Sequence, residues 1–183
     1  FKLNITTIIQ MTDYIEYIYK SGGEVYVVGG AVRNYLYNYF HNSDIPIKDY
    51  DILVRLLDQD SLTDILKKIG TVKEVGQSFG IVLFVPKGET EGIEFALPRT
   101  EISTGPGYRD FKVVPDHMMS IEEDFARRDA TINAMAIKVT SVKDFELLDI
   151  NKNTDVNIIN LIDPLKGIDD IKQKMWKCVG NPN

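Results

Sequence analysis

The segment VVGGAVRNYLYNYFHNSDIPIKDYDILV, which runs from Val27 to Val54, joins two apolar runs through a glycine pair and an amphipathic stretch. The apolar residues before the glycines are typical of a buried strand, and those after them repeat with the period of a helix. The second apolar run, YDILVRL, is typical of another strand. The segment therefore predicts a strand–turn–helix–strand unit and an α/β (α+β) fold.

The glycine pair, Gly29 and Gly30, lies where the first strand gives way to the helix. Glycine permits positive φ and lets a ligand approach the backbone closely, and a helix start offers free N–H groups with partial positive charge. Arg33 lies in the first helical turn, so the unit predicts a phosphate site. The spacing is neither that of a Walker loop nor that of the dinucleotide fingerprint. Taken alone, it is more typical of a tight turn with a surface arginine.

Two carboxylates, Asp49 and Asp51, precede the second apolar run. Residues two apart on a strand share one side, and two like charges so close repel unless a cation lies between them. Carboxylates combined with substrate phosphates suit Mg²⁺. An isolated pair of this kind is more often a solvated strand start, but the glycine turn one helix upstream favours a phosphoryl- or nucleotidyl-transfer site. Glu94, on an alternating strand, is either a third carboxylate of that site or a surface residue.

A further polar group, Arg128, Asp129 and Asn133, lies in RRDATINAMA. The segment from Ser120 predicts a helix with a Ser120–Glu123 capping box, on which Asp129 and Asn133 share a face. Arginine suits phosphate, and the aspartate and asparagine suit ribose hydroxyls. From spacing alone, a charged helix surface is an equally good interpretation.

The remaining pattern predicts one domain over residues 1–183. Helices are expected at 7–20, at 60–69 with Asp60 or Ser61 as N-cap and Gly70 after its end, and after Asp163. Three antiparallel strands are expected in TVKEVG, IVLFVP and GIEFALP, and a further strand in AIKV. The Gly- and Pro-containing stretch at 100–116 is expected to be a mobile loop.

Composition limits the class of protein. The chain has 183 residues and a net charge of −6, which is not typical of an autonomous nucleic-acid clamp but is compatible with a metal-dependent enzyme rich in carboxylates. Cys178 is the only cysteine, and with two histidines no disulfide or structural zinc site is expected. We therefore expect a reducing compartment, the cytoplasm, or an organelle if a targeting segment precedes Phe1. No apolar run is long enough to span a bilayer, so no membrane partner is expected.

Five motifs together resemble one family. From about Val25 to Pro182 the chain is similar, in motif order and spacing, to the class II tRNA nucleotidyltransferases, which comprise the CCA-adding enzymes and the related bacterial poly(A) polymerases. The motifs are VVGGAVRN, IKDYDILV, LPRTEISTGPGYRDF, EEDFARRDATINAMA and LIDPLKGIDDI.

The resemblance implies a head domain with a DNA polymerase β-like nucleotidyltransferase fold, a small mixed sheet flanked by helices. It implies transfer of CMP and AMP from CTP and ATP to the 3′ end of tRNA, with Mg²⁺ as cofactor. By position, the metal ligands are Asp49 and Asp51, and Glu94 matches a carboxylate of the catalytic set. The implied nucleotide-binding residues are Gly29 and Gly30 in the glycine turn, Arg33, Arg128, Asp129 and Asn133. Arg99 and Tyr108 fall in a region tied to specificity.

Two departures from the family pattern stand out. Asn34 replaces the usual aspartate beside Arg33, which removes a charge there. The neck element that reads the incoming base in the family is expected after Asn183, together with the tRNA-binding body and tail. The alternatives are therefore a poly(A) polymerase, an enzyme that adds only CC or only A, a head domain inactive on its own, or a non-catalytic binding module.

Overall fold

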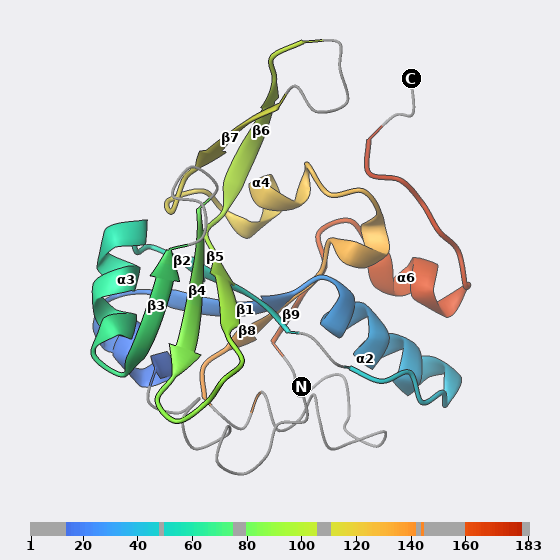
Figure 1. The fold of residues 1–183 in the computed structure, drawn as a ribbon. Coiled ribbons are helices and arrows are strands. Elements are labelled where there is room, and N and C mark those ends of the chain that lie inside the picture. Colours follow the sequence, from blue (N-terminus) through green and yellow to red (C-terminus); the bar gives the residue numbers. More distant parts are fainter. Residues whose placement is uncertain are drawn as a thin grey trace.

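The computed structural model describes residues 14–47, 50–74, 80–105, 111–141, 144 and 160–180. Within them, one mixed sheet has the strand order β3-β4-β5-β2-β1-β8-β9, and β6 and β7 form a separate two-stranded sheet (Figure 1). The strands are β1 (Glu24–Val28), β2 (Asp51–Arg55), β3 (Gly70–Glu74), β4 (Ile81–Pro86), β5 (Ile93–Ala96), β6 (Arg99–Ser103), β7 (Phe111–Pro115), β8 (Ala136–Val139) and β9 (Leu161–Ile162).

The helices flank the large sheet, as expected for the α/β prediction. They are α2 (Gly30–His41), α3 (Gln59–Lys67), α4 (Ile121–Phe125), α6 (Gly167–Lys172) and the 3₁₀ helix η2 (Thr131–Asn133), and residues 14–20 are also helical. β2 and β5 pair in parallel, whereas the other neighbouring strands pair antiparallel. This mixed sheet with flanking helices confirms the predicted fold class.

The two faces of the sheet bury different residues of the same strands. Val25 and Val27 of β1 belong to the larger core, while Tyr26 and Val28 belong to a smaller core that includes Phe125 of α4. This division follows from the alternation of side chains along a strand. Both faces of β1 are thus fixed by apolar packing, which holds the following glycine turn in place.

The helix of residues 14–20 covers the sheet through an aromatic cluster. The ring of Tyr14 lies edge-on to Phe84 and to Phe95, with centroids 5.6 Å apart in each pair. Edge-on pairs add about 0.5–1.5 kcal/mol each to the free energy gained from burial. The part of the predicted helix before Tyr14 lies outside the described residues.

The stretch expected to be a loop at 100–116 is largely an antiparallel hairpin. β6 and β7 pair from Arg99 opposite Pro115 to Ser103 opposite Phe111, and the hairpin projects from the body of the molecule (Figure 1). The prediction was wrong because both glycines and Pro106 lie between the two strands and Pro115 only ends the second one, while RTEIS and FKVV have strand composition. Tyr108 lies outside the described residues.

The predicted long helix after Ser120 was also wrong in its length. The capping box forms, with Glu123 N bonded to Ser120 Oγ and Ser120 N to the Glu123 carboxylate, but α4 ends at Phe125. The side chain of Asp129 accepts a bond from the backbone N–H of Ala130, which is extended and bridges Cys178. Such local side-chain bonds compete with helical ones, so the segment turns into η2 and β8.

Two further details of the sequence prediction need correction. The N-cap of α3 is Asp58, whose carboxylate accepts a bond from Ser61 N, rather than Asp60 or Ser61. Gly70 begins β3 instead of following the helix as a cap. Within the described ranges, the helices are all too short or too polar to cross a bilayer.

Candidate nucleotide-binding site

The site is built around the turn between β1 and α2. Gly29 is the N-cap of α2 with φ 72° and ψ −135°, a backbone conformation that side-chain-bearing residues rarely adopt. Its N–H donates to the carbonyl of Met135 at 3.3 Å, and its carbonyl accepts from Arg33 N at 3.1 Å. The turn is therefore fixed from both sides, and the first turn of α2 faces outward with its partial positive charge.

Asp51 faces this turn from the neighbouring strand. It pairs with Val28 in the β1–β2 register, one residue before Gly29. A Cβ atom added to Gly29 would lie 3.3 Å from Asp51 Oδ2 and 4.0 Å from Arg128 Nη1. Three residues predicted from the sequence to form one site are thus brought together. Asp49, the other predicted metal ligand, lies outside the described residues.

A chain of hydrogen bonds links the other predicted residues. Arg33 Nη1 donates to Asn133 Oδ1 at 2.7 Å, and Asn133 Nδ2 donates to both carboxylate oxygens of Asp129 at 3.1 and 3.3 Å. The bond from Asn133 is the main reason that the pKa of Asp129 is lowered. The two residues were expected to meet on a helix, and they meet through η2 instead.

Asn34, where the family usually has an aspartate, holds the side chain of Arg33. Its Oδ1 accepts a hydrogen bond of 3.1 Å from Arg33 Nε. With Asn133 on the other side of the guanidinium, the orientation of Arg33 is fixed by two neutral oxygens. The arginine therefore keeps its positive charge uncompensated by these two partners.

Asp124 is a buried carboxylate that the sequence analysis missed. It is 0% exposed, and it accepts bonds from Arg127 Nη2 at 2.9 Å and from Arg128 Nη2 at 3.3 Å. It also accepts from the backbone N–H of Arg99, the first residue of β6, at 3.1 Å. Burial, and then the nearby charge of Arg127, lower the pKa of Arg99. The spacing i, i+3 and i, i+4 to two arginines was the signal that could have identified it.

The segment 177–179 runs beside the site. Thr131 N donates to Lys177 O at 3.0 Å, and Val179 N donates to Asp129 O at 3.1 Å. The carboxylate of the buried Asp170 accepts a hydrogen bond of 2.7 Å from Thr131 Oγ1. It also forms an ion pair of 2.6 Å with Lys177. The backbone that carries Asp129 is therefore held by α6 and by the segment that follows it.

Glu94 lies on the strand next to Asp51. β5 pairs with β2 in parallel, with Ile52 opposite Phe95, so Asp51 and Glu94 each precede the paired residues by one position. Both side chains are exposed, whereas Ile52 and Phe95 are buried. This position is the one expected for a third carboxylate, and its catalytic role stays a prediction.

The donor chemistry at Asp51 fits a divalent cation. Its carboxylate is exposed and lies against a turn that favours phosphate, so one ion could contact the carboxylate and a phosphate together. Within the described residues, no group of three or more acidic, histidine or cysteine side chains is placed to hold a metal ion by itself. Mg²⁺ suits such a site because it is usually held by one or two carboxylates plus substrate phosphates.

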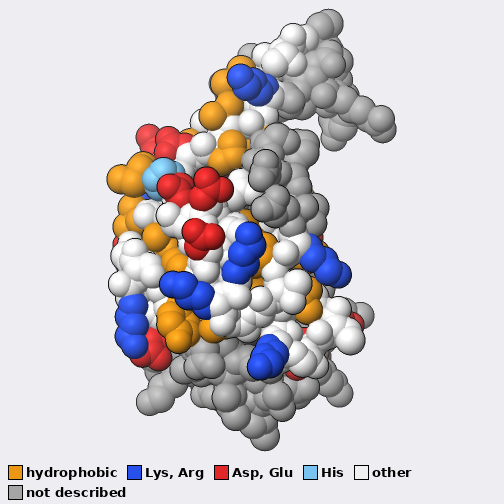
Figure 2. All heavy atoms as spheres, turned by 60° about the vertical axis from the view of Figure 1, so that its left-hand side comes forward, with side chains coloured by type: hydrophobic (Ala, Val, Ile, Leu, Met, Phe, Trp, Pro, Cys, Tyr) orange, Lys and Arg blue, Asp and Glu red, His pale blue; other side chains and the backbone are white. Residues whose placement is uncertain are grey.

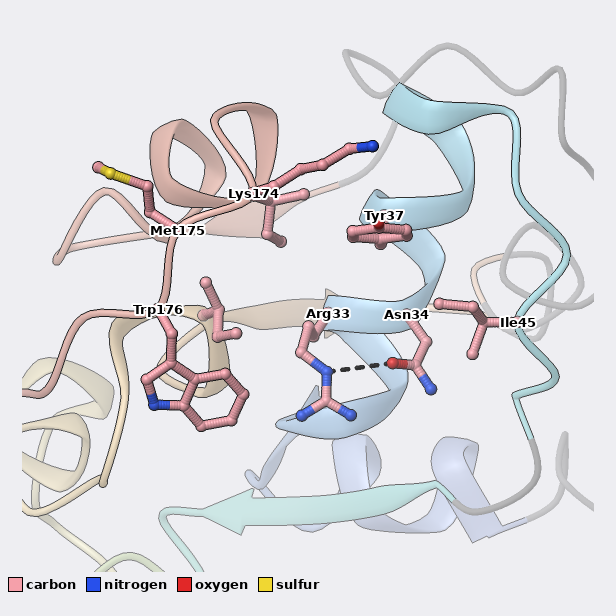
Figure 3. Close-up of a pocket in the computed structure, with 9 residues that line it drawn as sticks. Arg33, Asn34, Tyr37, Ile45, Lys174, Met175 and Trp176 are labelled. Atoms are coloured by element: carbon pink, nitrogen blue, oxygen red, sulfur yellow. Dashed lines mark hydrogen bonds between the residues drawn. The ribbon is translucent and has the colours of Figure 1, made fainter.

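A pocket of about 300 Å³ adjoins the site on the outer side of α2 (Figure 3). Its lining residues are Arg33, Asn34 and Tyr37 of α2, Ile45, Ile132, Ile171, Lys174, Met175 and Trp176. Arg33 thus belongs both to the hydrogen-bonded chain described above and to the pocket wall.

Comparisons with known proteins identify the family of the chain. A family model described as the poly(A) polymerase head domain matches residues 25–177. Two curated relatives, the multifunctional CCA proteins of Methylobacillus flagellatus and Xanthomonas campestris pv. campestris, are 34% and 35% identical over 85% and 86% of this chain. The chain spans about 30% of the length of each relative.

A solved structure agrees with these matches. The CCA-adding enzyme of Bacillus stearothermophilus in complex with CTP superposes with a TM-score of 0.63 at 26% identity, over 94% of this chain and 33% of the enzyme. The head-domain motifs, the mixed sheet and the clustered site residues agree with these matches. The chain therefore belongs to the family of poly(A) polymerase head domains, which its CCA-adding relatives share.

Proposed function

We propose that the chain is the catalytic head of a template-independent nucleotidyltransferase that adds CMP and AMP from CTP and ATP to the 3′ end of tRNA. The observation that carries the proposal is that the Asp51 carboxylate and Arg128 both face the open side of Gly29, where an added Cβ atom would lie 3.3 and 4.0 Å from them. The CCA-adding relatives and the complex of one such enzyme with CTP support the choice of substrates.

In the proposed reaction, the 3′-hydroxyl oxygen of the RNA attacks the α-phosphorus of the nucleoside triphosphate. A new P–O bond forms, the bond between the α-phosphorus and the bridging oxygen breaks, the hydroxyl proton passes to solvent water, and pyrophosphate leaves. The first turn of α2, with Arg33 and Arg128, binds the triphosphate and stabilises its developing charge. Asp129 and Asn133 bind the ribose hydroxyls.

Asp51, with Asp49 as the second predicted ligand, would hold Mg²⁺. When bound, Mg²⁺ lowers the pKa of the attacking hydroxyl and neutralises charge on the triphosphate. Because Asp51 is fixed opposite Val28, its carboxylate is positioned before substrate arrives. Glu94 would add a third carboxylate at the same edge of the sheet.

The tRNA contact of this head alone should be weak. The face shown in Figure 2 carries acidic and basic side chains interspersed, without a continuous basic band among its described residues. Phosphate binding requires clustered Lys and Arg and produces steep salt dependence. Because the chain also has a net charge of −6, we propose that most of the tRNA affinity comes from parts beyond this head.

The test is incorporation of labelled CTP and ATP into tRNA lacking its CCA end. Asp51→Asn should abolish incorporation and leave the melting temperature close to that of the unaltered chain. Asp60→Asn, at an exposed position on α3, serves as the matched loss of a carboxylate and should retain incorporation. Full incorporation by the Asp51 variant would refute the assignment.

The family model favours a second candidate, a poly(A) polymerase. Such an enzyme would share the phosphate-binding turn at Gly29 and the metal-binding carboxylates, and it would differ in its product. Sequencing of the 3′ ends made on one defined tRNA separates the two, because CCA addition stops after three residues whereas poly(A) synthesis continues. The same experiment identifies an enzyme that adds only CC or only A.

A further inference from the structure

The segment that carries the proposed ribose contacts has little regular structure of its own. η2 is a 3₁₀ helix of three residues, Thr131–Asn133, and its N-cap, Ala130, makes no side-chain capping bond. Asp129 lies just before this N-cap, and Asn133 is the last residue of the turn. A single 3₁₀ turn has few internal hydrogen bonds. The placement of Asp129 and Asn133 therefore depends on what packs against the turn.

Asp170 of α6 is the buried group that contacts the middle of this segment. It is 2% exposed, and its Oδ2 accepts a hydrogen bond of 2.7 Å from Thr131 Oγ1. Thr131 lies two residues after Asp129 and two before Asn133. A hydrogen bond to a carboxylate is stronger than one between neutral groups. Asp170 therefore fixes the centre of the segment whose two ends are proposed to bind the ribose.

The carboxylate of Asp170 also fixes the backbone that pairs with the segment. Its Oδ1 forms the ion pair of 2.6 Å with Lys177 Nζ, and the carbonyl of Lys177 accepts from Thr131 N at 3.0 Å. Two residues further along, Val179 N donates to the carbonyl of Asp129 at 3.1 Å. Asp170 thus holds the segment in two ways, directly through Thr131 and indirectly through residues 177–179.

The start of α6 lies against the same turn. A Cβ atom added to Gly167 would lie 2.5 Å from the carbonyl oxygen of Thr131, so α6 and η2 approach each other through main-chain atoms. This end of α6 is itself fixed, because the carboxylate of Asp163 accepts from Gly167 N at 2.7 Å and from Ile168 N at 3.0 Å. Asp170 therefore acts on η2 from a helix that is fixed in place.

We propose that Asp170 is a positioning residue for ribose recognition. Its bonds to Thr131 and Lys177 hold the segment in the placement from which Asp129 and Asn133 bond the ribose hydroxyls. The inference rests on the proposed function, in which that pair binds the ribose. Asp170 is itself too buried to contact the nucleotide. The preference of the site for ribonucleotides over 2′-deoxyribonucleotides thus depends on a residue beneath the binding surface.

A purely structural role of Asp170 would have a different consequence. Loss of a bond that only stabilises the fold would lower the melting temperature and would weaken CTP and 2′-deoxy-CTP by the same factor. Loss of a positioning bond weakens CTP selectively, because only the ribonucleotide has the 2′-hydroxyl. The ratio of the two affinities therefore distinguishes the two roles.

Calorimetric titration of the chain and its variants with CTP and with 2′-deoxy-CTP measures this ratio. The unaltered chain should bind CTP about tenfold more tightly, the effect of one hydrogen bond to a charged group. Thr131→Val keeps the branched shape and removes the bond to Asp170. It should reduce the ratio to about twofold, through weaker binding of CTP. Thr131→Ser keeps a hydroxyl and should retain the ratio of the unaltered chain.

Two further variants complete the comparison. Asp170→Asn weakens the pairing with Lys177 from the other partner, and it should reduce the ratio as Thr131→Val does. Asp58→Ala is the control for lost stability, because the Asp58 carboxylate caps α3, on the other side of the large sheet from α6 (Figure 1). Loss of this cap should lower the melting temperature and leave the ratio unchanged.

The outcomes separate this inference from the proposed function. If nucleotides bind and are incorporated but Thr131→Val and Asp170→Asn keep the full ratio, the positioning role is wrong and the function stands. Equal weakening of CTP and 2′-deoxy-CTP in both variants would show that Asp170 acts on stability alone, which also overturns the inference. If the unaltered chain neither binds nor incorporates nucleotide, both fail.

Discussion

The carboxylate of Asp51 lies so close to Gly29 that a Cβ atom on Gly29 would be in tight contact with it. The added Cβ atom would lie 3.3 Å from Asp51 Oδ2, and the φ of 72° would disfavour any side chain. We predict that Gly29→Ala lowers the free energy of unfolding by about 1–3 kcal/mol, the cost of a positive-φ conformation that side-chain-bearing residues rarely adopt, and also reduces nucleotide incorporation at least tenfold. Urea denaturation and an incorporation assay measure the two effects.

Gly22 provides the matched control for this prediction. Its φ is +88°, but a Cβ atom there meets nothing within 4 Å. Gly22→Ala should therefore show a comparable loss of stability with normal incorporation. Equal loss of incorporation in both variants would mean that the effect at Gly29 is one of stability alone.

The buried Asp124 should be more important for stability than its exposed neighbours on α4. We predict that Asp124→Asn lowers the free energy of unfolding by about 3–5 kcal/mol, because breaking a buried ion pair leaves uncompensated charge on Arg127 and Arg128. It should also raise the KM for nucleotide more than it lowers kcat, since Arg128 is displaced from the triphosphate. Glu122→Gln, on the same helix and exposed, should change stability by less than about 0.5 kcal/mol.

Arg33 should not tolerate replacement by lysine. Its guanidinium donates at once to Asn34 and to Asn133, a geometry that a single ammonium group cannot reproduce. We predict that Arg33→Lys raises the KM for CTP and ATP about tenfold while stability changes by less than about 1 kcal/mol. An unchanged KM would show that the charge alone suffices at this position.

The acid stability of the chain should depend on Asp170. Lys177 and Thr131 lower the pKa of its carboxyl group in the folded state. The group therefore contributes stability above the ordinary carboxyl pKa of about 4, and this contribution is lost as the pH falls through the lower folded value. We predict that Asp170→Asn is less stable at neutral pH and loses less stability on acidification. Unfolding curves between pH 7 and pH 3 measure this.

Asp169 supplies the comparison for the acid experiment. It is the preceding residue on α6 and its side chain is exposed. Asp169→Asn should retain the full acid dependence of the unaltered chain. If both variants flattened the profile equally, the effect would come from the overall charge of α6 and not from the pair with Lys177.

The sequence predicted those features that depend on local pattern. The strand–glycine–helix unit and the buried strands β1 and β2 follow from short-range patterns of apolar residues, and the structure confirms them. Asp51 and Arg128 were expected at one site through the family resemblance, and they lie together at Gly29. Asp49 and its metal role stay predictions, because that residue lies outside the described part of the chain.

The features that were missed depend on contacts between distant segments. The helix predicted beyond Phe125 gives way to a turn and to the extended Ala130, which bridges Cys178, far along the sequence. The role of Asp124 was missed because a carboxylate in the first turn of a helix is usually explained by the helix dipole. Its burial depends on Arg99, which is brought there by the fold of the β6–β7 hairpin.

The β6–β7 hairpin projects from the body, yet its root and Arg128 are bound to the same carboxylate of Asp124. Arg127 strengthens this joint by donating to the carbonyl of Arg99 as well. The first residue of the hairpin is thus held by the same carboxylate that holds the side chain of Arg128. A rotation of β6 about its first residue would therefore act on the same carboxylate that holds the guanidinium of Arg128.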